Sequence, residues 1–171
     1  MSSICITSID EYEALQSFYT ATGGEQWTWK SGDVRWNFNV PQSTDDPCRN
    51  AWSGLNCTDY CSVYRIDLPG YNLRGSIPFS FTQLANLSYL DLSLNYISSL
   101  ASTEIGNFSN LTYIDLSQNI ISGLLPASLF EESYNRLEQI YLQYNRFSGH
   151  LPLMQSLQNT LQVFIRMHLH L

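Results

Sequence analysis

Apolar residues recur at a regular interval in the second half of the chain. Two stretches, beginning at Leu87 and Leu111, place leucine or isoleucine at their first, fourth and sixth positions and asparagine at the ninth. A further copy begins at Val63, the same interval before Leu87, and another begins at Leu137, after a slightly longer interval. A fifth start is expected at Leu161, where the shorter interval returns. Self-similarity at such a period predicts a repeat architecture.

Each copy predicts a short strand followed by a turn. Alternate residues such as Leu90 and Leu92 point to one face of a strand. One coil cannot bury that face alone, so successive coils must stack into a solenoid. The turn leaves buried backbone groups that an Asn amide can satisfy, which predicts a structural ladder of Asn95, Asn119 and Asn145. The first copy has Tyr71 at this position and Asn72 beside it.

The pattern L-x-x-L-x-L-x-x-N-x-L resembles the leucine-rich repeat. Gly75-Ser76-Ile77-Pro78, Gly123-Leu124-Leu125-Pro126 and Gly149-His150-Leu151-Pro152 are similar to the L-x-G-x-I-P signature of plant-type repeats. The second copy departs from it, with Ser99-Leu100-Ala101-Ser102. The resemblance implies an α/β solenoid, a right-handed coil with short parallel strands on its concave face.

Residues 1–62 lack the repeat and are predicted to cap the apolar end of the solenoid. Ser8-Ile9-Asp10-Glu11 matches a capping box that opens a helix. Gly23-Gly24 suits a left-handed helix end. The helix would place on one face Tyr12, Leu15, Phe18 and Tyr19. All four tryptophans lie in this segment, which predicts a small aromatic core rather than a ligand site.

The segment also resembles the N-terminal cap of plant-type leucine-rich-repeat proteins. The similarity lies in Ala21-Thr22-Gly23-Gly24-Glu25-Gln26-Trp27, in Asp46-Pro47-Cys48 and in Trp52-Ser53-Gly54-Leu55-Asn56-Cys57. It covers roughly residues 8–160 together with the repeats, and it implies a helical cap with a disulfide between Cys48 and Cys57. Four cysteines allow three full pairings. Cys5 and Cys61 would remain as a second pair, whereas a Cys57–Cys61 bridge would displace the first.

The chain is therefore divided into three parts. Residues 1–62 form the cap, and residues 63–160 form four repeats that start at 63, 87, 111 and 137. Residues 161–171 are a degenerate or truncated fifth repeat, in which Phe164 fits an inward position but Arg166 falls on another. The two residues inserted before the fourth repeat are assigned to 131–135. This ending predicts that the chain is a fragment of a longer protein.

Composition and chemistry exclude several functions. Eight Lys and Arg against 15 Asp and Glu give a net charge of -7, which disfavours nucleic acid as a partner. The sequence contains no run of 18 apolar residues, so no segment of it is expected to span a bilayer. Its first residues show no secretory signal. The cysteine spacing lacks a zinc knuckle, so no metal or cofactor is expected.

Catalytic groups are sparse, so the chain is predicted not to be an enzyme. His150 lies in a predicted turn, and His168 and His170 lie in the tail, where no Ser-His-Asp triad can be placed. Asp45-Asp46 and Glu131-Glu132 are adjacent carboxylates on predicted loops and are interpreted as solvated charge. No phosphate-binding glycine motif occurs.

Four Asn-x-Ser/Thr sequons are candidate glycosylation sites: Asn56, Asn86, Asn107 and Asn110. At Asn86 and Asn110 the same letters also fit the repeat consensus. Sequons and disulfide-type cysteines favour an extracellular or cell-surface location, with a cytoplasmic protein carrying reduced thiols as the alternative. A processed or incomplete chain would reconcile this location with the missing signal.

Outward positions on the stacked strands form columns on the predicted concave face. The first column is Arg65, Tyr89, Tyr113 and Gln139, the second Asp67, Asp91, Asp115 and Tyr141, and the third Gly70, Leu94, Gln118 and Tyr144. Strands about 4.8 Å apart would make a patch of tyrosines beside carboxylates. Tyrosine is a large, amphipathic recognition residue, whereas Asp-Leu-Ser also fits the repeat consensus. The predicted ligand-binding residues are Tyr89, Tyr113, Tyr141, Tyr144, Asp91 and Asp115.

Two classes of function remain. The first is a non-enzymatic recognition module that binds a protein, peptide or glycan through the concave face, as the resemblance to receptor-kinase ectodomains and secreted inhibitors implies. The alternative is a structural or scaffolding repeat protein without a dedicated ligand.

Overall fold

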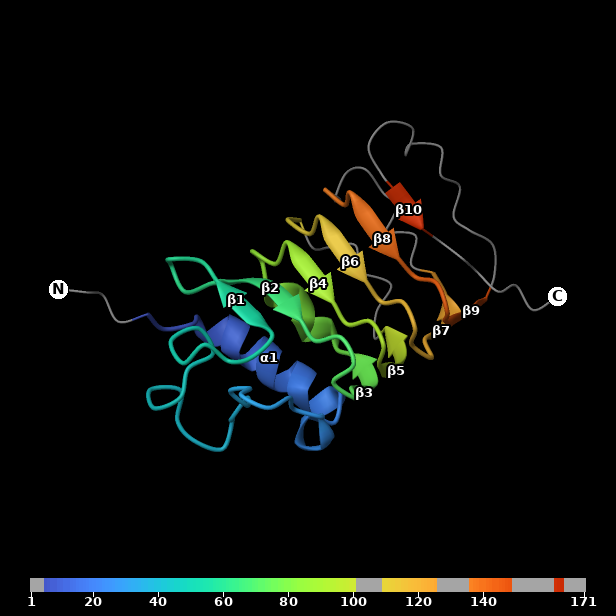
Figure 1. Cartoon of the computed structure of the whole chain (residues 1–171). Coiled ribbons are helices and arrows are strands. Elements are labelled where there is room, and N and C mark those ends of the chain that lie inside the picture. The colour runs from blue at the N-terminus through green and yellow to red at the C-terminus, as the bar shows by residue number, and fades with distance from the viewer. Residues whose placement is uncertain (1–4, 101–108, 126–135, 149–161, 165–171) are drawn as a thin grey trace.

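The computed structural model describes residues 5–100, 109–125, 136–148 and the strand residues 162–164 (Figure 1). Its main sheet has six strands in the order β1-β2-β4-β6-β8-β10. These are β1 (Leu55–Cys57), β2 (Val63–Asp67), β4 (Tyr89–Asp91), β6 (Tyr113–Asp115), β8 (Gln139–Tyr141) and β10 (Gln162–Phe164). Strand β1 of the cap pairs antiparallel with β2, and all later pairs are parallel. The chain is thus a leucine-rich-repeat solenoid whose sheet the cap extends by one strand.

The strand register follows the repeat spacing through the fourth coil. Tyr89 pairs with Arg65 and with Tyr113, and Tyr113 pairs with Gln139 in spite of the longer interval before the fourth repeat. The inward residue at the centre of each strand, such as Leu90 or Ile114, is fully buried. Outward and inward positions therefore fall on the sides that the periodicity predicts.

The fifth coil departs from the predicted register. Val163, not Phe164, pairs with Ile140, so the pairing is shifted by one position from the one that the repeat spacing predicts. In the predicted register the next inward position of the sequence falls on Arg166, whereas alternation from Val163 gives the apolar Ile165. The side chains of this strand lie outside the part of the chain that the structure describes, so the inward position of Phe164 stays a prediction.

Two small parallel sheets on the other side of the coils were not expected from the sequence. One joins β3 (Arg74–Ile77) to β5 (Tyr96–Leu100), and the other joins β7 (Ser122–Leu124) to β9 (Arg146–Ser148). In the second coil, which lacks the Gly-x-Ile-Pro signature, Leu100 still pairs with Ile77. A short 3₁₀ helix, η2 (Phe79–Gln83), follows β3.

Asparagine side chains connect each turn to the neighbouring coil. The Asn119 amide donates to the carbonyls of Leu92, Leu116 and Ser117 at 2.9, 3.1 and 3.3 Å, and its oxygen accepts from the Ile97 N–H at 2.9 Å. Asn95 and Asn145 make the corresponding bonds one coil earlier and one coil later. Each amide therefore satisfies backbone groups in two coils at once.

The cap is built on α1 (Ile9–Ala21), followed by a 3₁₀ turn, η1 (Gly24–Gln26). The Ser8 side chain accepts from the Glu11 N–H, and Gly23 closes the helix with φ 69°. The apolar face of α1 packs against a cluster of indole rings, and Phe18 stacks on Phe81 of η2 with ring centroids 4.6 Å apart. Within the described ranges, no helix is both long and apolar enough to cross a membrane.

Glu11 does not complete the predicted capping box. Its buried carboxylate instead accepts from the Ser62 hydroxyl and from the Val63 N–H at the start of β2. Burial raises the pKa of the Glu11 carboxyl, although these two hydrogen bonds oppose the shift. The carboxylate thereby ties the cap helix to the first strand of the repeats.

Asp46 is not the solvated loop charge that the sequence suggests. It is fully buried, and its carboxylate accepts from the N–H and hydroxyl of Thr7 at 2.9 and 3.0 Å and from the N–H groups of Cys48 and Arg49. Burial raises the pKa of this carboxyl, but hydrogen bonds from Arg49, Gln42 and Thr7 outweigh it and leave the pKa below its usual range. Asp46 therefore organises the cap loop around a buried negative charge.

Two disulfides close the cap. Cys48 and Cys57 form the bridge that the family resemblance implies, across a short loop. Cys5 and Cys61 form the second, with a sequence separation of 56. The second bridge ties the N-terminal end of the cap to the loop that enters β2.

Removing the long-range bridge should destabilise the protein more than removing the short one. The chain-entropy model gives roughly 4 kcal/mol for a loop of the Cys5–Cys61 size and roughly 2.5 kcal/mol for one of the Cys48–Cys57 size. Urea denaturation of Cys5→Ala/Cys61→Ala and Cys48→Ala/Cys57→Ala, each with the other bridge intact, measures the difference. Greater destabilisation of the short-loop variant would contradict the prediction.

Asn119→Ala should lower the free energy of unfolding by about 1–3 kcal/mol, because it leaves buried carbonyls and an N–H without partners. The matched control is Asn39→Ala, since Asn39 is exposed and its side chain makes no hydrogen bond within the described residues. Thermal or urea midpoints measure both variants. Equal midpoints would show that the ladder does not carry this energy.

Candidate functional site

Three tyrosines and an arginine form a continuous stack on the outward face of the main sheet. The Tyr89 and Tyr113 rings are parallel within 3°, with centroids 4.2 Å apart. The Arg65 guanidinium lies 3.5 Å above the other face of Tyr89. Tyr141 adds a tilted ring 5.6 Å from Tyr113. These four residues are called the aromatic ladder below.

The ladder exists because paired strands place their outward residues in adjacent rows. Arg65, Tyr89 and Tyr113 occupy equivalent positions in β2, β4 and β6. The fourth coil has Gln139 at this position, and Tyr141, at the end of the same strand, supplies the last ring. The Tyr141 hydroxyl donates to the Gln139 side chain at 3.3 Å. Periodicity places Arg65 in the column of Tyr89, but it does not reveal that the guanidinium stacks on the ring.

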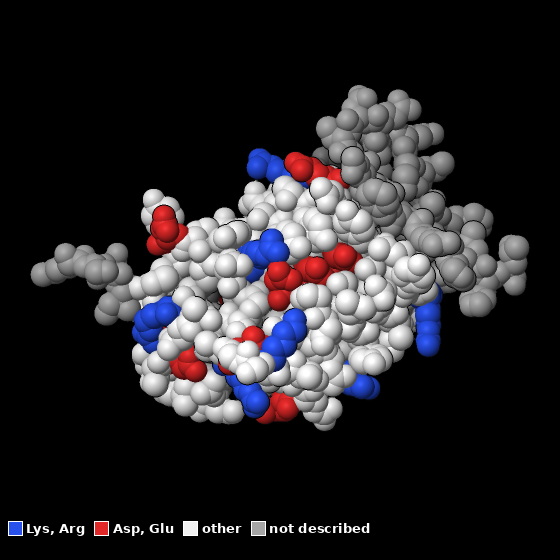
Figure 2. Space-filling view, viewed as in Figure 1, with Lys and Arg blue, Asp and Glu red and all other residues white. Residues whose placement is uncertain are grey.

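Carboxylates at the ends of β2, β4 and β6 form a row beside the ladder, visible as the line of acidic atoms near the centre of Figure 2. Asp67 pairs with the Arg65 guanidinium at 2.6 Å. Asp91 accepts from the Ser93 N–H at 2.9 Å, and Asp115 accepts from the Ser117 N–H at 2.8 Å. Each carboxylate therefore has an internal partner, and Asp91 and Asp115 fix the turns that follow their strands.

The row and the ladder influence each other electrostatically. Burial raises the pKa of Asp91, hydrogen bonds from Ser93 oppose this, and the charges of Asp115 and Asp67 add to it. Burial and a hydrogen bond to Tyr89 raise the pKa of Tyr113 well above its usual range. Burial raises the pKa of Tyr89 as well, so the Tyr89 and Tyr113 hydroxyls remain neutral hydrogen-bonding groups at physiological pH.

Tyr144 lies apart from the strands, on the turn after β8. It adopts φ 59°, as Leu94 and Gln118 adopt φ 59° and 55° at the same place in earlier coils. The Leu94 and Gln118 N–H groups bond to carbonyls of the following coil. The shared backbone conformation thus explains the third column, and Tyr144 is 53% exposed.

Other candidates are partly accessible. Asn56 and Asn86 are exposed, and the amides of Asn86 and Asn110 donate to the Ser62 hydroxyl and the Ala85 carbonyl. Glycosylation at these positions stays a prediction. In the part of the chain that the structure describes, no three His, Cys, Asp or Glu side chains gather to hold a metal ion. Outside the described residues lie Asn107, His150, His168, His170 and the Glu131-Glu132 pair.

Comparison with known proteins agrees with the geometry. The leucine-rich repeat family model matches residues 61–121. A probable LRR receptor-like serine/threonine-protein kinase of Arabidopsis thaliana is 36% identical over 75 residues, which are 43% of this chain and 7% of the relative. A probable leucine-rich repeat receptor-like protein kinase of the same plant is 41% identical over 73 residues, 42% of this chain and 6% of its own. The chain thus spans less than a tenth of the length of these relatives.

Solved structures extend the similarity into the cap. The BIR2 ectodomain of Arabidopsis thaliana matches 92% of this chain and 79% of its own with a TM-score of 0.71 and 28% identity. The PEPR1–AtPEP1 structure matches 82% of this chain and 18% of its own, with a TM-score of 0.66 and 28% identity. The SOBIR1 ectodomain, at 22% identity, shares the fold with a TM-score of 0.61. The chain thus has a leucine-rich-repeat fold that is similar to the fold of plant receptor-kinase ectodomains.

Replacing Asp115 by Asn should bring the pKa of Asp91 closer to the ordinary Asp value of 3.8, because one of the charges that raise it is removed. Carboxyl-detected NMR titration of Asp91 measures the change. Asp10→Asn, in the first turn of α1, is the control and should leave Asp91 unaffected. An unchanged Asp91 pKa in Asp115→Asn would show that the row is not electrostatically coupled.

Proposed function

We propose that this chain is a non-enzymatic, extracellular recognition module that binds a peptide or protein partner on its concave sheet. The observation that carries the proposal is the aromatic ladder, in which Tyr89, Tyr113 and Tyr141 are packed before any partner arrives. Interface energy concentrates in a few such aromatic residues. A scaffold without a dedicated ligand has no need of a row of half-buried tyrosines on its open face.

The packing of the ladder determines how it would contact a partner. Arg65 and Tyr113 cover the two faces of the Tyr89 ring, so ring edges and hydroxyls remain for contact. Side chains already held by stacking lose little further conformational entropy on binding. The ladder thus combines apolar edges with neutral donors and acceptors, a combination suited to the side chains and backbone of a peptide.

The charge beside the ladder favours one kind of partner. Three carboxylates, those of Asp67, Asp91 and Asp115, lie next to the single cation of Arg65. A partner that presents an amine or guanidinium beside an apolar side chain would complement both features. The net charge of the whole chain indicates this preference for a cationic partner only weakly, because the acidic residues are spread over both the cap and the repeats.

Relatives support the class of function. The BIR2 structure is that of an ectodomain, and PEPR1 was solved together with AtPEP1. The matched curated relatives are receptor-like kinases, of which this chain corresponds to a short part. Two disulfides are consistent with an oxidising compartment such as the cell exterior. A place in a longer receptor therefore belongs to the same proposal.

Tyr113→Ala and Tyr141→Ala should each weaken binding of a partner by about 1 kcal/mol or more, roughly fivefold in Kd. The partner is first isolated with the full-length protein, and affinities are then measured by calorimetry. Tyr96→Ala is the matched control, because Tyr96 lies on β5 of the small sheet, is 49% exposed and contacts Arg74 in the way Tyr89 contacts Arg65.

If Tyr113→Ala, Tyr141→Ala and the control Tyr96→Ala all bind the partner as tightly as the parent does, the concave site is refuted. Equal losses in all three variants would indicate a partner that contacts the small sheets as well. If the partner is a glycan and its binding depends on Tyr113, the site is supported, but the partner is not the polypeptide that we propose.

A further inference from the structure

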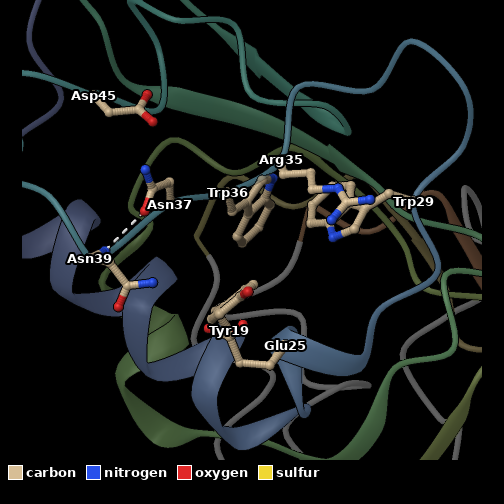
Figure 3. A pocket seen from close by; sticks show the side chains of 8 residues that line it. All are labelled: Tyr19, Glu25, Trp29, Arg35, Trp36, Asn37, Asn39 and Asp45. Carbon is tan, nitrogen blue, oxygen red and sulfur yellow. Dashed lines mark hydrogen bonds between the residues drawn. The ribbon is translucent and has the colours of Figure 1, made fainter.

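A pocket of about 360 Å³ opens in the cap, separate from the aromatic ladder (Figure 3). Its aromatic wall consists of Tyr19, Trp29 and Trp36. Its polar lining comes mainly from the segment 35–39 and from two carboxylates, Glu25 and Asp45. In Figure 3, Asn37, Asn39 and Asp45 lie to one side of the Trp36 ring, and Arg35 and Trp29 to the other. The pocket therefore combines ring surfaces with hydrogen-bonding groups on both sides of them.

The aromatic wall is rigid because it belongs to the core of the cap. Tyr19 and Trp36 are stacked within 25° with centroids 6.4 Å apart, and the Trp36 N–H donates to the Ser53 carbonyl at 2.9 Å. Trp29 packs at 5.5 Å from Trp27 and edge-on to Tyr71. A ligand would meet preformed surfaces, which lowers the entropic penalty of binding.

Several polar groups of the lining make no hydrogen bond to the residues that the structure describes. The indole N–H groups of Trp27, Trp36 and Trp52 all donate internally, but that of Trp29 has no acceptor in the part of the chain that the structure describes. The same described residues offer the Arg35 guanidinium neither a hydrogen bond nor an ion pair. The Asn39 side-chain amide is equally without a partner there. These donors border the pocket and are open to a ligand.

The charges of the lining restrict the class of ligand. An anion would meet the carboxylates of Glu25 and Asp45, and a cation would meet Arg35. A wholly apolar molecule would deprive the polar groups of water without replacing their hydrogen bonds. A neutral molecule with hydroxyls on its edge and C–H groups on its faces satisfies all of these surfaces, and this is the chemistry of a sugar ring.

We propose that the cap pocket binds a neutral saccharide of one or two pyranose rings. The C–H face of the sugar lies against Tyr19 and Trp29, which are partly exposed, while the buried Trp36 supports them from behind. Arg35, Asn37 and Asn39 donate to its hydroxyl oxygens. Glu25 and Asp45 accept from its hydroxyl protons, while one Asp45 oxygen continues to hold the Trp52 N–H at 2.7 Å. The volume lies near the lower end of small-ligand sites, roughly 300–1,000 Å³, and suits a ligand of this size.

The site shares no residue with the aromatic ladder, so it can fail or succeed independently of the concave site. Tyr113→Ala should leave saccharide affinity unchanged, and the pocket variants should leave binding of a concave partner unchanged. A glycan on a partner, a free oligosaccharide or a wall polymer would supply the same neutral ring. The proposal concerns that shared chemistry.

The test uses the disulfide-bonded chain and three neutral disaccharides, cellobiose, xylobiose and mannobiose, with digalacturonic acid as the anionic counterpart. Saturation-transfer NMR and tryptophan fluorescence follow binding. We expect saturable binding of at least one neutral disaccharide and weaker or no binding of digalacturonic acid. Arg35→Ala and Asn39→Ala should each weaken binding at least tenfold. Trp29→Phe, which keeps a ring and removes the N–H, should weaken it severalfold without loss of the fold.

Two variants outside the pocket serve as matched controls. Gln16→Ala changes an exposed amide on α1, and Arg146→Ala removes an exposed arginine on β9. Both should bind as the parent does, and thermal midpoints of all variants should stay within a few degrees. The proposal fails if none of the neutral disaccharides saturates the protein. It also fails if Arg35→Ala and Asn39→Ala bind like the parent, or if digalacturonic acid binds more tightly than every neutral disaccharide.

Discussion

Each coil of this solenoid can bury its apolar face only against the next coil, and the other features follow from that requirement. Stacking brings the inward residues Ile66, Leu90, Ile114 and Ile140 into one core column. It also brings turn carbonyls of neighbouring coils close together, where the asparagine ladder binds them. The same parallel register aligns the outward residues into rows. Core packing thus sets the spacing of the aromatic ladder, whereas the residues found at these outward positions give it its chemistry.

The first coil has no preceding coil, and the cap replaces one. Phe18 of α1 stacks on Phe81, and the buried Glu11 carboxylate binds the start of β2. The backbone of α1 comes so close to β3 that a Cβ atom at Gly75 would lie 2.1 Å from the Ala21 carbonyl oxygen. Gly75, with φ 119°, can occupy this place because it has no side chain. The glycine of the first Gly-x-Ile-Pro signature therefore allows the cap helix to pack closely against β3, in addition to its role in the turn.

Periodicity was sufficient to predict the repeated part of the fold. The inward positions are strictly apolar, and a slip of one residue in the strand pairing would turn these side chains toward solvent. It predicted the columns of Tyr89 and Asp91 for the same reason. It could not predict pairings between residues far apart in sequence that follow no period, such as Glu11 with Val63 or Asp46 with Thr7. It did not predict the register of the fifth coil, in which Val163 pairs with Ile140, because Val163 and Phe164 are both apolar.

The two candidate surfaces use aromatic side chains in opposite ways. In the ladder, stacking covers the ring faces of Tyr89, and partners can reach edges and hydroxyls. In the cap pocket, rings line an open space beside donors, such as the Trp29 N–H and the Arg35 guanidinium, that the described residues leave unpaired. Edges and hydroxyls suit an extended polypeptide, whereas the partly exposed rings of Tyr19 and Trp29 with flanking donors suit a hydroxyl-bearing sugar ring. Because the groups differ and are held by separate packing, binding at one surface need not alter the other.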